Sequence, residues 1–176
     1  VLIKNVGTNP TRDGMLKVCR QMGGEISIVN QREESGEPCA DLLVSYSHLK
    51  GTVIEGDLIP TLIDELPILA VLAAFAEGTT VIRDAAELKV KESNRIASVA
   101  EGLLAMGAVV TETEDGMIIQ GGTPLKGASI QTFDDHRIAM SFSIAALAAE
   151  GETEIVGADC VTISSPSFYQ DLERLQ

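Results

Sequence analysis

The stretch IDELPILAVLAAFAEG, residues 63–78, reads as a helix that is apolar on nearly every side. It opens with acidic residues, ends in Ala-Glu-Gly and leads into TTVIRDA (79–85), whose β-branched residues favour a strand. The same arrangement recurs in DDHRIAMSFSIAALAAEG (134–151), which leads into TEIVGAD (153–159). A helix without a polar face is buried on all sides, so we expect two inner helices, each followed by a strand.

These two strands and VLIKNVG (1–7) are spaced roughly 75–80 residues apart, as in proteins built from internal repeats. The repeating unit reads strand, buried helix, strand, half-exposed helix, strand pair. We therefore expect an α/β fold in which residues 1–176 form one domain of about two and a half units. The first unit lacks its opening strand and buried helix, and the last lacks its closing strand pair. Together with a first residue that is not Met, this suggests a piece of a longer protein.

The half-exposed helices carry one apolar face each. In TRDGMLKVCRQMGG (11–24), Thr11 is the expected N-cap residue. In ESNRIASVAEGLLAMGA (92–108), Leu104 is expected on the buried face. The predicted strand pairs are EISIVNQ with DLLVSYS, and AVVTETE with GMIIQGG, the second turning through Glu114-Asp115-Gly116.

The composition is that of an ordinary globular protein, with 45% hydrophobic and 22% charged residues among 176. Aromatic residues make up 3% and the net charge is −13, which argues against a nucleic-acid partner. The longest apolar stretches are about half a membrane span, so we expect no membrane association. Three scattered cysteines without metal-ligand spacing predict reduced thiols, a cytoplasmic location and no bound metal.

The stretch KVKESNR (89–95) gathers Lys91, Glu92 and Arg95 at helical spacing. The simplest interpretation is a solvated first turn with one ion pair. However, the dipole of a helix disfavours cations at its N-terminus and favours anions there. The cations at this helix start therefore indicate a site for a phosphate or a carboxylate.

The two apolar helices also begin with charged residues, Asp64-Glu65 in one and Asp134-Asp135-His136-Arg137 in the other. Helix capping by the carboxylates is the structural alternative. An arginine in a cleft can instead grip a carboxylate or phosphate, and a histidine can transfer protons near neutral pH. Because the repeat places both helix starts at equivalent positions, we expect five side chains to converge on one rim: Asp64, Glu92, Arg95, His136 and Arg137.

The sequence resembles the C-terminal half of the EPSP synthase family. The matching stretches are NPTRDGML, LIDELPILAVLAAFAEGTTVIRDAAELKVKESNR, TFDDHRIAMSFSIAALAAEG and CVTISSPSFYQDLERL. The resemblance implies an α+β prism, one enolpyruvyl transferase-like lobe of repeated βαβαββ units around buried helices, in a two-lobed monomeric enzyme. It also implies transfer of the enolpyruvyl group from phosphoenolpyruvate to the 5-hydroxyl of shikimate 3-phosphate, in aromatic amino acid biosynthesis. No metal or organic cofactor is expected, and the N-terminal lobe of the same enzyme is the expected partner. The family is a target of the herbicide glyphosate.

The motif match assigns a role to each residue. Asp64 resembles the carboxylate that takes the proton of the sugar hydroxyl, and it lies with Lys91 against shikimate 3-phosphate. Glu92 resembles the acid that protonates the methylene of phosphoenolpyruvate and later removes a proton. His136 resembles a histidine beside that site, and we expect it to take part in catalysis. A reaction through a cation-like carbon needs an acid and a base on either side of it.

The remaining assignments concern anion binding. Arg95 and Arg137 resemble the arginines that hold phosphoenolpyruvate. Some family members carry a lysine where this chain has Ile163, so no ligand contact is expected there. Some members carry Asn at the position of Glu87, which makes a contact of Glu87 with the sugar phosphate unexpected. Two alternatives stay open: a UDP-N-acetylglucosamine enolpyruvyl transferase-like enzyme, whose family lacks this motif pairing, and a non-catalytic α/β repeat scaffold with its polar residues scattered.

Overall fold

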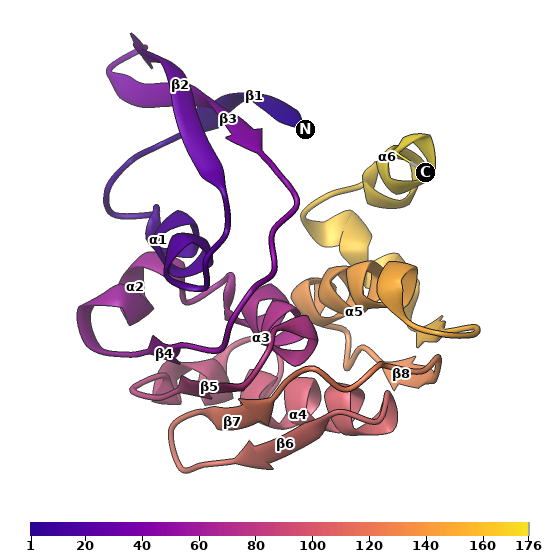
Figure 1. Ribbon diagram of the computed structural model, residues 1–176. Helices are drawn as coiled ribbons and strands as arrows, with labels where there is room; N and C mark the ends of the chain where they lie inside the picture. Colours follow the sequence, from indigo (N-terminus) through magenta and orange to yellow (C-terminus); the bar gives the residue numbers. More distant parts are fainter. Residues whose placement is uncertain (176) are drawn as a thin grey trace.

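The computed structural model describes residues 1–175, and its elements recur along the chain in the predicted order (Figure 1). In chain order they are β1 (Leu2–Gly7), α1 (Gly14–Gln21), β2 (Ile26–Glu34), β3 (Glu37–Val44), β4 (Val53–Ile54), η1 (Gly56–Leu58), α2 (Ile59–Leu62), α3 (Leu66–Phe75), β5 (Thr79–Ile82), η2 (Ala86–Val90), α4 (Arg95–Ala105), β6 (Val109–Glu112), β7 (Met117–Gln120), β8 (Ser129–Gln131), α5 (His136–Ala148), β9 (Glu154–Val156), η3 (Ala158–Ile163) and α6 (Phe168–Arg174). The mixture of helices and strands confirms the predicted α/β class.

The strands form three separate sheets, with the orders β1-β3-β2, β4-β5-β7-β6 and β8-β9. In the second and third sheets, the strand before the inner helix runs parallel to the strand after it, as β4 to β5 and β8 to β9. The second sheet is completed by the antiparallel strands β7 and β6. The second unit, from β4 to β7, therefore has the complete order βαβαββ. The first unit begins at the strand equivalent to β5, and the third ends with α6 within the described residues.

The inner helices α3 and α5 pack against each other and against α4. Helix α3 is shorter than the predicted 63–78, because it begins at Leu66 with Pro67 in its first turn. Within residues 1–175, no single helix is long and apolar enough to cross a membrane. The segments Gly56–Leu62 and Leu66–Phe75 meet that length and composition test only when joined, and they bend by 112° at the break between them.

The prediction that the inner helices are buried on every side is wrong for one shared face. Phe75, Ile144 and Leu147 leave 36%, 38% and 52% of their surfaces exposed. This face lines an open groove of about 600 Å³, formed by Tyr46, Ser47, His48, Leu49, Ile68, Val71, Leu72, Phe75, Glu77, Ile144 and Ala148. The face is open because the described part of the first unit has no inner helix to cover it.

Helix α1 begins later than predicted. Its N-cap position is Asp13 and its first residue is Gly14, so the prediction of Thr11 as N-cap is wrong. The reason is a competing local hydrogen bond: the Asn9 side chain accepts from the backbone N–H and the hydroxyl of Thr11, which draws Thr11 into a turn.

Helix α4 is capped by Asn94, whose side chain accepts a hydrogen bond from the N–H of Ala97 (3.3 Å). Leu104, predicted on the buried face, is 52% exposed, because its neighbour Leu103 occupies the packed stripe. Gly102 allows α4 to approach α5 closely: a Cβ at this position would lie 2.3 Å from the ring of Phe142.

Both predicted strand pairs are confirmed. Strand β2 pairs with β3 from Ile26 opposite Val44 to Glu34 opposite Glu37, with a bulge along the way. Strands β6 and β7 pair in register, and the N–H of Thr113 donates to the carbonyl of Gly116 across the turn. These hairpins lie at opposite edges of the molecule, β2–β3 at the top and β6–β7 at the bottom of Figure 1.

Candidate active site

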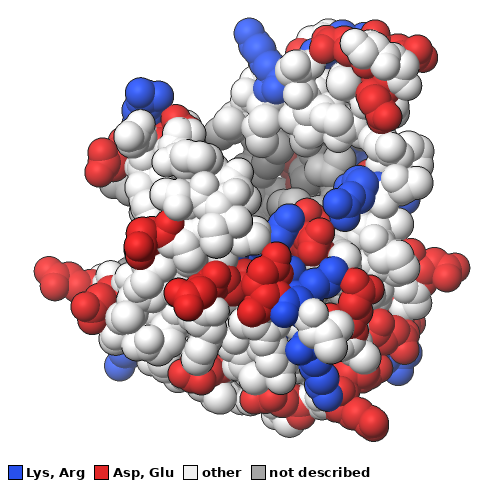
Figure 2. Space-filling view, turned by 180° about the vertical axis from the view of Figure 1, so that it is seen from behind, with Lys and Arg blue, Asp and Glu red and all other residues white. Residues whose placement is uncertain are grey.

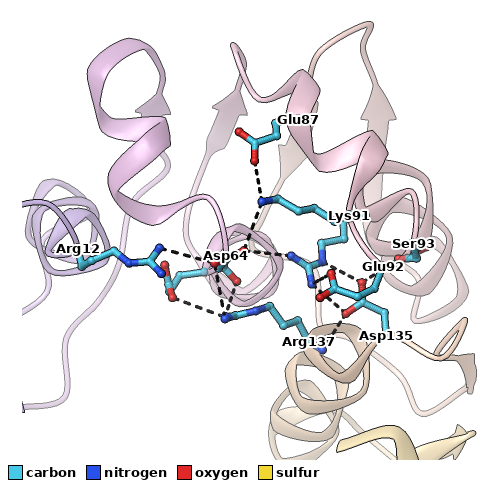
Figure 3. Close-up of polar contacts among 11 residues, drawn as sticks. Arg12, Asp64, Glu87, Lys91, Glu92, Ser93, Asp135 and Arg137 are labelled. Atoms are coloured by element: carbon cyan, nitrogen blue, oxygen red, sulfur yellow. Dashed lines mark hydrogen bonds and ion pairs between the residues drawn. The ribbon is translucent and has the colours of Figure 1, made fainter. Parts of the chain in front are cut away.

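Asp64 lies two residues before the start of α3 and is surrounded by four cationic side chains (Figure 3). Its Oδ1 lies 3.3 Å from Arg95 and 3.8 Å from Lys91, and its Oδ2 lies 3.6 Å from Arg12 and 3.8 Å from Arg137. Each carboxylate oxygen therefore faces two positive charges.

The four cations come from all three repeat units. Arg12 precedes α1 in the first unit, Lys91 and Arg95 flank the start of α4 in the second, and Arg137 lies in the first turn of α5 in the third. Their side chains meet because equivalent helices of the units begin at the same end of the molecule, around the start of α3 (Figure 3). No single repeat unit contains the whole site, which forms only where the three units pack together.

Arg95 is the buried centre of the cluster, with a side chain that is 1% exposed. Its Nε donates to Oδ2 of Asp135 (2.8 Å), and its Nη2 donates to Oε2 of Glu92 (2.6 Å) and to Oδ1 of Asp135 (3.3 Å). Its Nη1 donates to Oδ1 of Asp64 (3.3 Å). Ser93 donates to Asp135 as well (3.0 Å). All three guanidinium nitrogens are therefore engaged by carboxylates.

Asp135 has two functions at the start of α5. Its Oδ1 accepts a hydrogen bond from the N–H of Arg137 (2.9 Å), so the capping alternative holds for Asp135. Its carboxylate is also fully buried against Arg95. The two residues before it, Phe133 and Asp134, have φ angles of 53° and 57°, in the left-handed region that L-residues seldom adopt. This sharp backbone turn aims the Asp135 side chain inward while the chain enters the helix.

The outer side chains of the cluster are half-buried and face solvent. Nη1 of Arg137 donates to the backbone carbonyl of Asp64 (2.9 Å) and lies 3.5 Å from Glu65. Nζ of Lys91 donates to Oε1 of Glu87 (2.7 Å). Arg137 and Lys91, together with the more exposed Arg12, are thus the cations that a ligand approaching from solvent can meet.

The charges of the cluster shift its titration. Burial raises the pKa of Asp64, but Arg137, Lys91, Arg95 and Arg12 together lower it, and the net pKa lies below its usual value. Burial likewise raises the pKa of Asp135, but the hydrogen bonds and the charge of Arg95 lower it by more. The net pKa of Asp135 therefore also lies below its usual value. For Arg95, burial lowers the pKa, and the hydrogen bond and charge of Asp135 more than offset this. Asp64, Asp135 and Arg95 are therefore all charged at neutral pH.

Acidic and basic side chains gather in the middle of one face of the molecule, below a hollow in its surface (Figure 2). An open cavity of about 220 Å³ adjoins the cluster and is lined by Asp64, Glu65, Ile68, Arg137, Met140, Ser141, Ile144 and Phe168. One end of the cavity is charged and the other is apolar. A small anion with a hydrophobic portion fits this character.

Five of the predicted site residues are linked by hydrogen bonds and ion pairs in one network, namely Asp64, Lys91, Glu92, Arg95 and Arg137. This gathering is the opposite of what a non-catalytic scaffold with scattered polar residues predicts. One local expectation was wrong: Lys91 and Glu92 do not share a helix with Arg95, because the Asn94 cap makes Arg95 the first helical residue.

His136 does not join this network, although it begins the same helix as Arg137. Its side chain is buried, and its Nδ1 has no hydrogen-bond partner among the described residues. The structure therefore brings His136 to the end of the inner helices without bringing its imidazole to the carboxylates.

Of the two positions that depart from the family pattern, Glu87 lies at the edge of the cluster. Glu87 contacts Lys91 and is mostly exposed. Ile163, the last residue of η3, is 70% exposed. Within residues 1–175, no group of three or more His, Cys, Asp or Glu side chains is arranged to hold a metal ion.

Sequence reasoning missed three residues of the network: Arg12, Ser93 and Asp135. Arg12 and Asp135 stand in the stretches NPTRDGML and DDHR, whose local patterns predict a helix start and a helix cap. The signal that could have found Asp135 is a second acidic residue beside a cap at the start of an apolar helix. Nothing in the local pattern around Arg12 points to Asp64.

Comparison with known proteins gives a consistent answer. A model of the family described as EPSP synthase (3-phosphoshikimate 1-carboxyvinyltransferase) matches residues 1–172. Curated relatives named 3-phosphoshikimate 1-carboxyvinyltransferase occur in Synechococcus sp. (strain JA-3-3Ab), 58% identical over 175 residues, and in Desulforamulus reducens, 54% identical over 175 residues. These alignments cover 99% of this chain and 39% and 41% of the relatives.

A solved structure of EPSP synthase from Acinetobacter baumannii superposes with a TM-score of 0.95 at 44% identity. The superposition covers 99% of this chain and 41% of that one. The chain therefore spans well under half of the length of the proteins that it matches.

Proposed function

Because the chain belongs to the EPSP synthase family, we propose that, within a longer polypeptide, it transfers the enolpyruvyl group of phosphoenolpyruvate to the 5-hydroxyl of shikimate 3-phosphate and releases phosphate. The observation that carries this proposal is the pair of carboxylates on one guanidinium: Asp64 on Nη1 of Arg95 and Glu92 on Nη2. Two carboxylates beside clustered cations supply both proton transfer and anion binding in one place.

The proton transfers are assigned to Asp64 and Glu92. Once it has left Arg95, Glu92 takes up a proton from solvent and enters the reaction as a carboxylic acid. Asp64 takes the proton of the attacking hydroxyl as its oxygen bonds to C2 of phosphoenolpyruvate, while Glu92 adds its proton to C3. In the second half, Glu92 removes a proton from the resulting methyl group as the C2–O bond to phosphate breaks. Glu92 thus returns to its starting state, and the proton taken by Asp64 leaves with phosphate. The low pKa of Asp64 keeps it ionised, and therefore a base, at neutral pH.

The anions are assigned to the cations of the cluster. Arg137 and Lys91 face the surface, so Arg137 is the first contact for phosphoenolpyruvate and Lys91 that for shikimate 3-phosphate. Arg95 binds phosphoenolpyruvate only after Glu92 moves, because Glu92 occupies Nη2 in the ligand-free arrangement. We expect the arriving substrate anion to replace the Glu92 carboxylate on that nitrogen, which frees Glu92 for proton transfer.

His136 is kept as a catalytic residue of the proposal. Its buried Nδ1 has no partner among the described residues, so that nitrogen is available to bond a substrate oxygen. The chemistry assigned to these side chains needs no metal and no organic cofactor, and none is part of the proposal.

We further propose that the chain forms most of the C-terminal lobe and that its partner is the rest of the same polypeptide. The open groove between α3 and α5 supports this, because the repeat calls for a third inner helix there. The relatives are more than twice as long as the chain, so they have the length to supply that helix and a second lobe. A monomeric, cytoplasmic enzyme is proposed, in line with the free thiols of its cysteines.

The test uses the full-length polypeptide with both substrates and a phosphate-release assay. Glu92→Gln should abolish turnover, while calorimetry should still detect binding of phosphoenolpyruvate. Arg137→Ala should instead weaken that binding. Glu101→Gln, on the exposed face of α4, is the matched control and should leave both unchanged.

The chain by itself should release no phosphate, because without the second lobe of the longer polypeptide the outer cations Arg137 and Lys91 remain open to water. Exposed ion pairs contribute only about 1 kcal/mol or less there. Adding the missing lobe in trans should restore some turnover. Near-normal turnover by Glu92→Gln, or turnover by the chain alone, would contradict the assignment of the site.

A further inference from the structure

The segment Asn9-Pro10-Thr11-Arg12 has no part in the catalytic roles assigned above, yet it is a well-made turn. The N–H of Arg12 donates to the carbonyl of Asn9 (2.9 Å), and Pro10 holds the second position of the turn. The Asn9 side chain accepts from the N–H (3.0 Å) and the hydroxyl (2.9 Å) of Thr11. The backbone that carries Arg12 is therefore fixed by three local hydrogen bonds.

The next residues fix the distance between this turn and the site. Gly14, the first residue of α1, packs against the helix that precedes Asp64: a Cβ there would lie 2.2 Å from Oγ1 of Thr61 and 2.9 Å from Cβ of Leu62. A glycine is thus required for α1 to approach α2 this closely. The close approach sets Arg12 beside Asp64, two residues after Leu62.

The contact complements those of the other cations. Nη1 of Arg12 lies 3.6 Å from Oδ2 of Asp64, on the opposite side of the carboxylate from Arg95 and Lys91. Arg137 shares Oδ2 with Arg12 at 3.8 Å. Figure 3 shows Arg12 approaching Asp64 from α1, away from the remaining cations. The carboxylate is therefore held from both sides.

We propose that Arg12 is a positioning residue for Asp64: it holds the carboxylate between two sets of cations and keeps it in the ionised form that accepts a proton. This inference rests on the proposed function in so far as Asp64 is the base. It adds a residue of the first unit to the reaction and gives the NPTR stretch a role.

The expected size of the effect follows from exposure and from the other charges around Asp64. Those charges are Lys91 after η2, Arg95 in α4, Arg137 in α5 and the neighbouring carboxylate Glu65. The Arg12 side chain is 61% exposed, so water screens it strongly. We expect its removal to raise the pKa of Asp64 by about half a pH unit in the open site, and by more when a bound substrate excludes water.

The test measures Asp64 directly in the full-length polypeptide. Aspartate is labelled with ¹³C at the carboxyl carbon, the Asp64 signal is assigned with Asp64→Asn, and its titration is followed in wild type and in three variants. Arg12→Gln should shift the midpoint upward, and Arg12→Lys, which keeps the charge, should shift it less. Arg83→Gln is the matched control, since Arg83 is a similarly exposed arginine paired with Glu55 and not with Asp64 in the described network.

Kinetics give the second measurement. If Asp64 is the base, the acidic limb of the kcat/KM profile should move to higher pH in Arg12→Gln by the same amount as the NMR midpoint, with little change near pH 8. An unchanged Asp64 midpoint in Arg12→Gln, or an equal shift in Arg83→Gln, would overturn the inference. If the wild-type polypeptide does not use the two substrates, the proposed function fails, while the NMR titration still decides the role of Arg12.

Discussion

Replacing Asp135 by Asn should destabilise the chain strongly, because Asp135 is the fully buried counter-ion of Arg95. The substitution keeps the size of the side chain and an oxygen that can still cap α5. It removes the negative charge, however, and turns one of the two acceptor oxygens into a donor. That donor must then face either Ser93 and Nε of Arg95, or Nη2 of Arg95 and the N–H of Arg137.

The magnitude follows from the contacts. Removing one partner of a buried ion pair costs about 3–5 kcal/mol. Glu92 and Asp64 remain on the same guanidinium and compensate part of its charge, so we place the loss at the lower end, about 3 kcal/mol. For a chain of this length, that loss lowers the Tm by roughly 6–12 °C.

The assay is urea denaturation of the purified chain at pH 7, followed by circular dichroism. The matched control is Asp134→Asn, the same substitution one residue earlier at an exposed position with a φ of 57°, where Asn is well tolerated. The control should stay within about 0.5 kcal/mol of wild type. If Asp135→Asn also stays within about 1 kcal/mol, the buried pair is not the anchor that we infer.

Gly102→Ala should lower the stability by about 1–3 kcal/mol, because the new methyl group meets the ring of Phe142. Ala normally stabilises a helix relative to Gly, so a rise in the urea midpoint would contradict this. The pKa values of Asp64 and Asp135 are lowered in the folded chain, so their contribution to stability is complete above about pH 5 and is lost as the pH falls below about 4. Urea midpoints between pH 7 and 3 should show this fall, and a flat profile would count against it. Ile144→Asp should cost the full-length polypeptide several-fold more stability than the chain alone, because we propose that an inner helix of the longer polypeptide covers the groove. Equal losses in both would argue against a covering segment.

Much of the fold could be predicted because it depends on periodicity. Helices α3 and α5 stand out by their lack of a polar face, and the hairpins by their alternation and turns. The start of α3 could not be predicted, because the preceding residues form a separate short helix that bends away. The exposed face at Ile144 escaped prediction for a different reason: burial was inferred from apolarity, and the covering element is not within the described residues.

The site was predicted less completely. The motif residues around Asp64 converge as expected, because repeat symmetry fixes where equivalent helices begin. Asp135 was explained locally as a cap, which is true, but its pairing with Arg95 across 40 residues of sequence has no local signal. The Arg12 contact depends on the packing of Gly14 against α2, which only the tertiary structure reveals.

The way in which the cluster spans the chain has a consequence for the order of folding. Its contacts join Asp64 to Arg95 across 31 residues, Arg95 to Asp135 across 40, and Asp64 to Arg137 across 73. Each of these contacts closes a long loop, which costs chain entropy, so it is stable only when packing elsewhere offsets that cost. The β2–β3 and β6–β7 hairpins and the single helices form from residues close in sequence and do not carry this cost. The charged cluster can therefore be complete only after the start of α5 has been made, and until then Arg95 lacks Asp135 and Asp64 lacks Arg137.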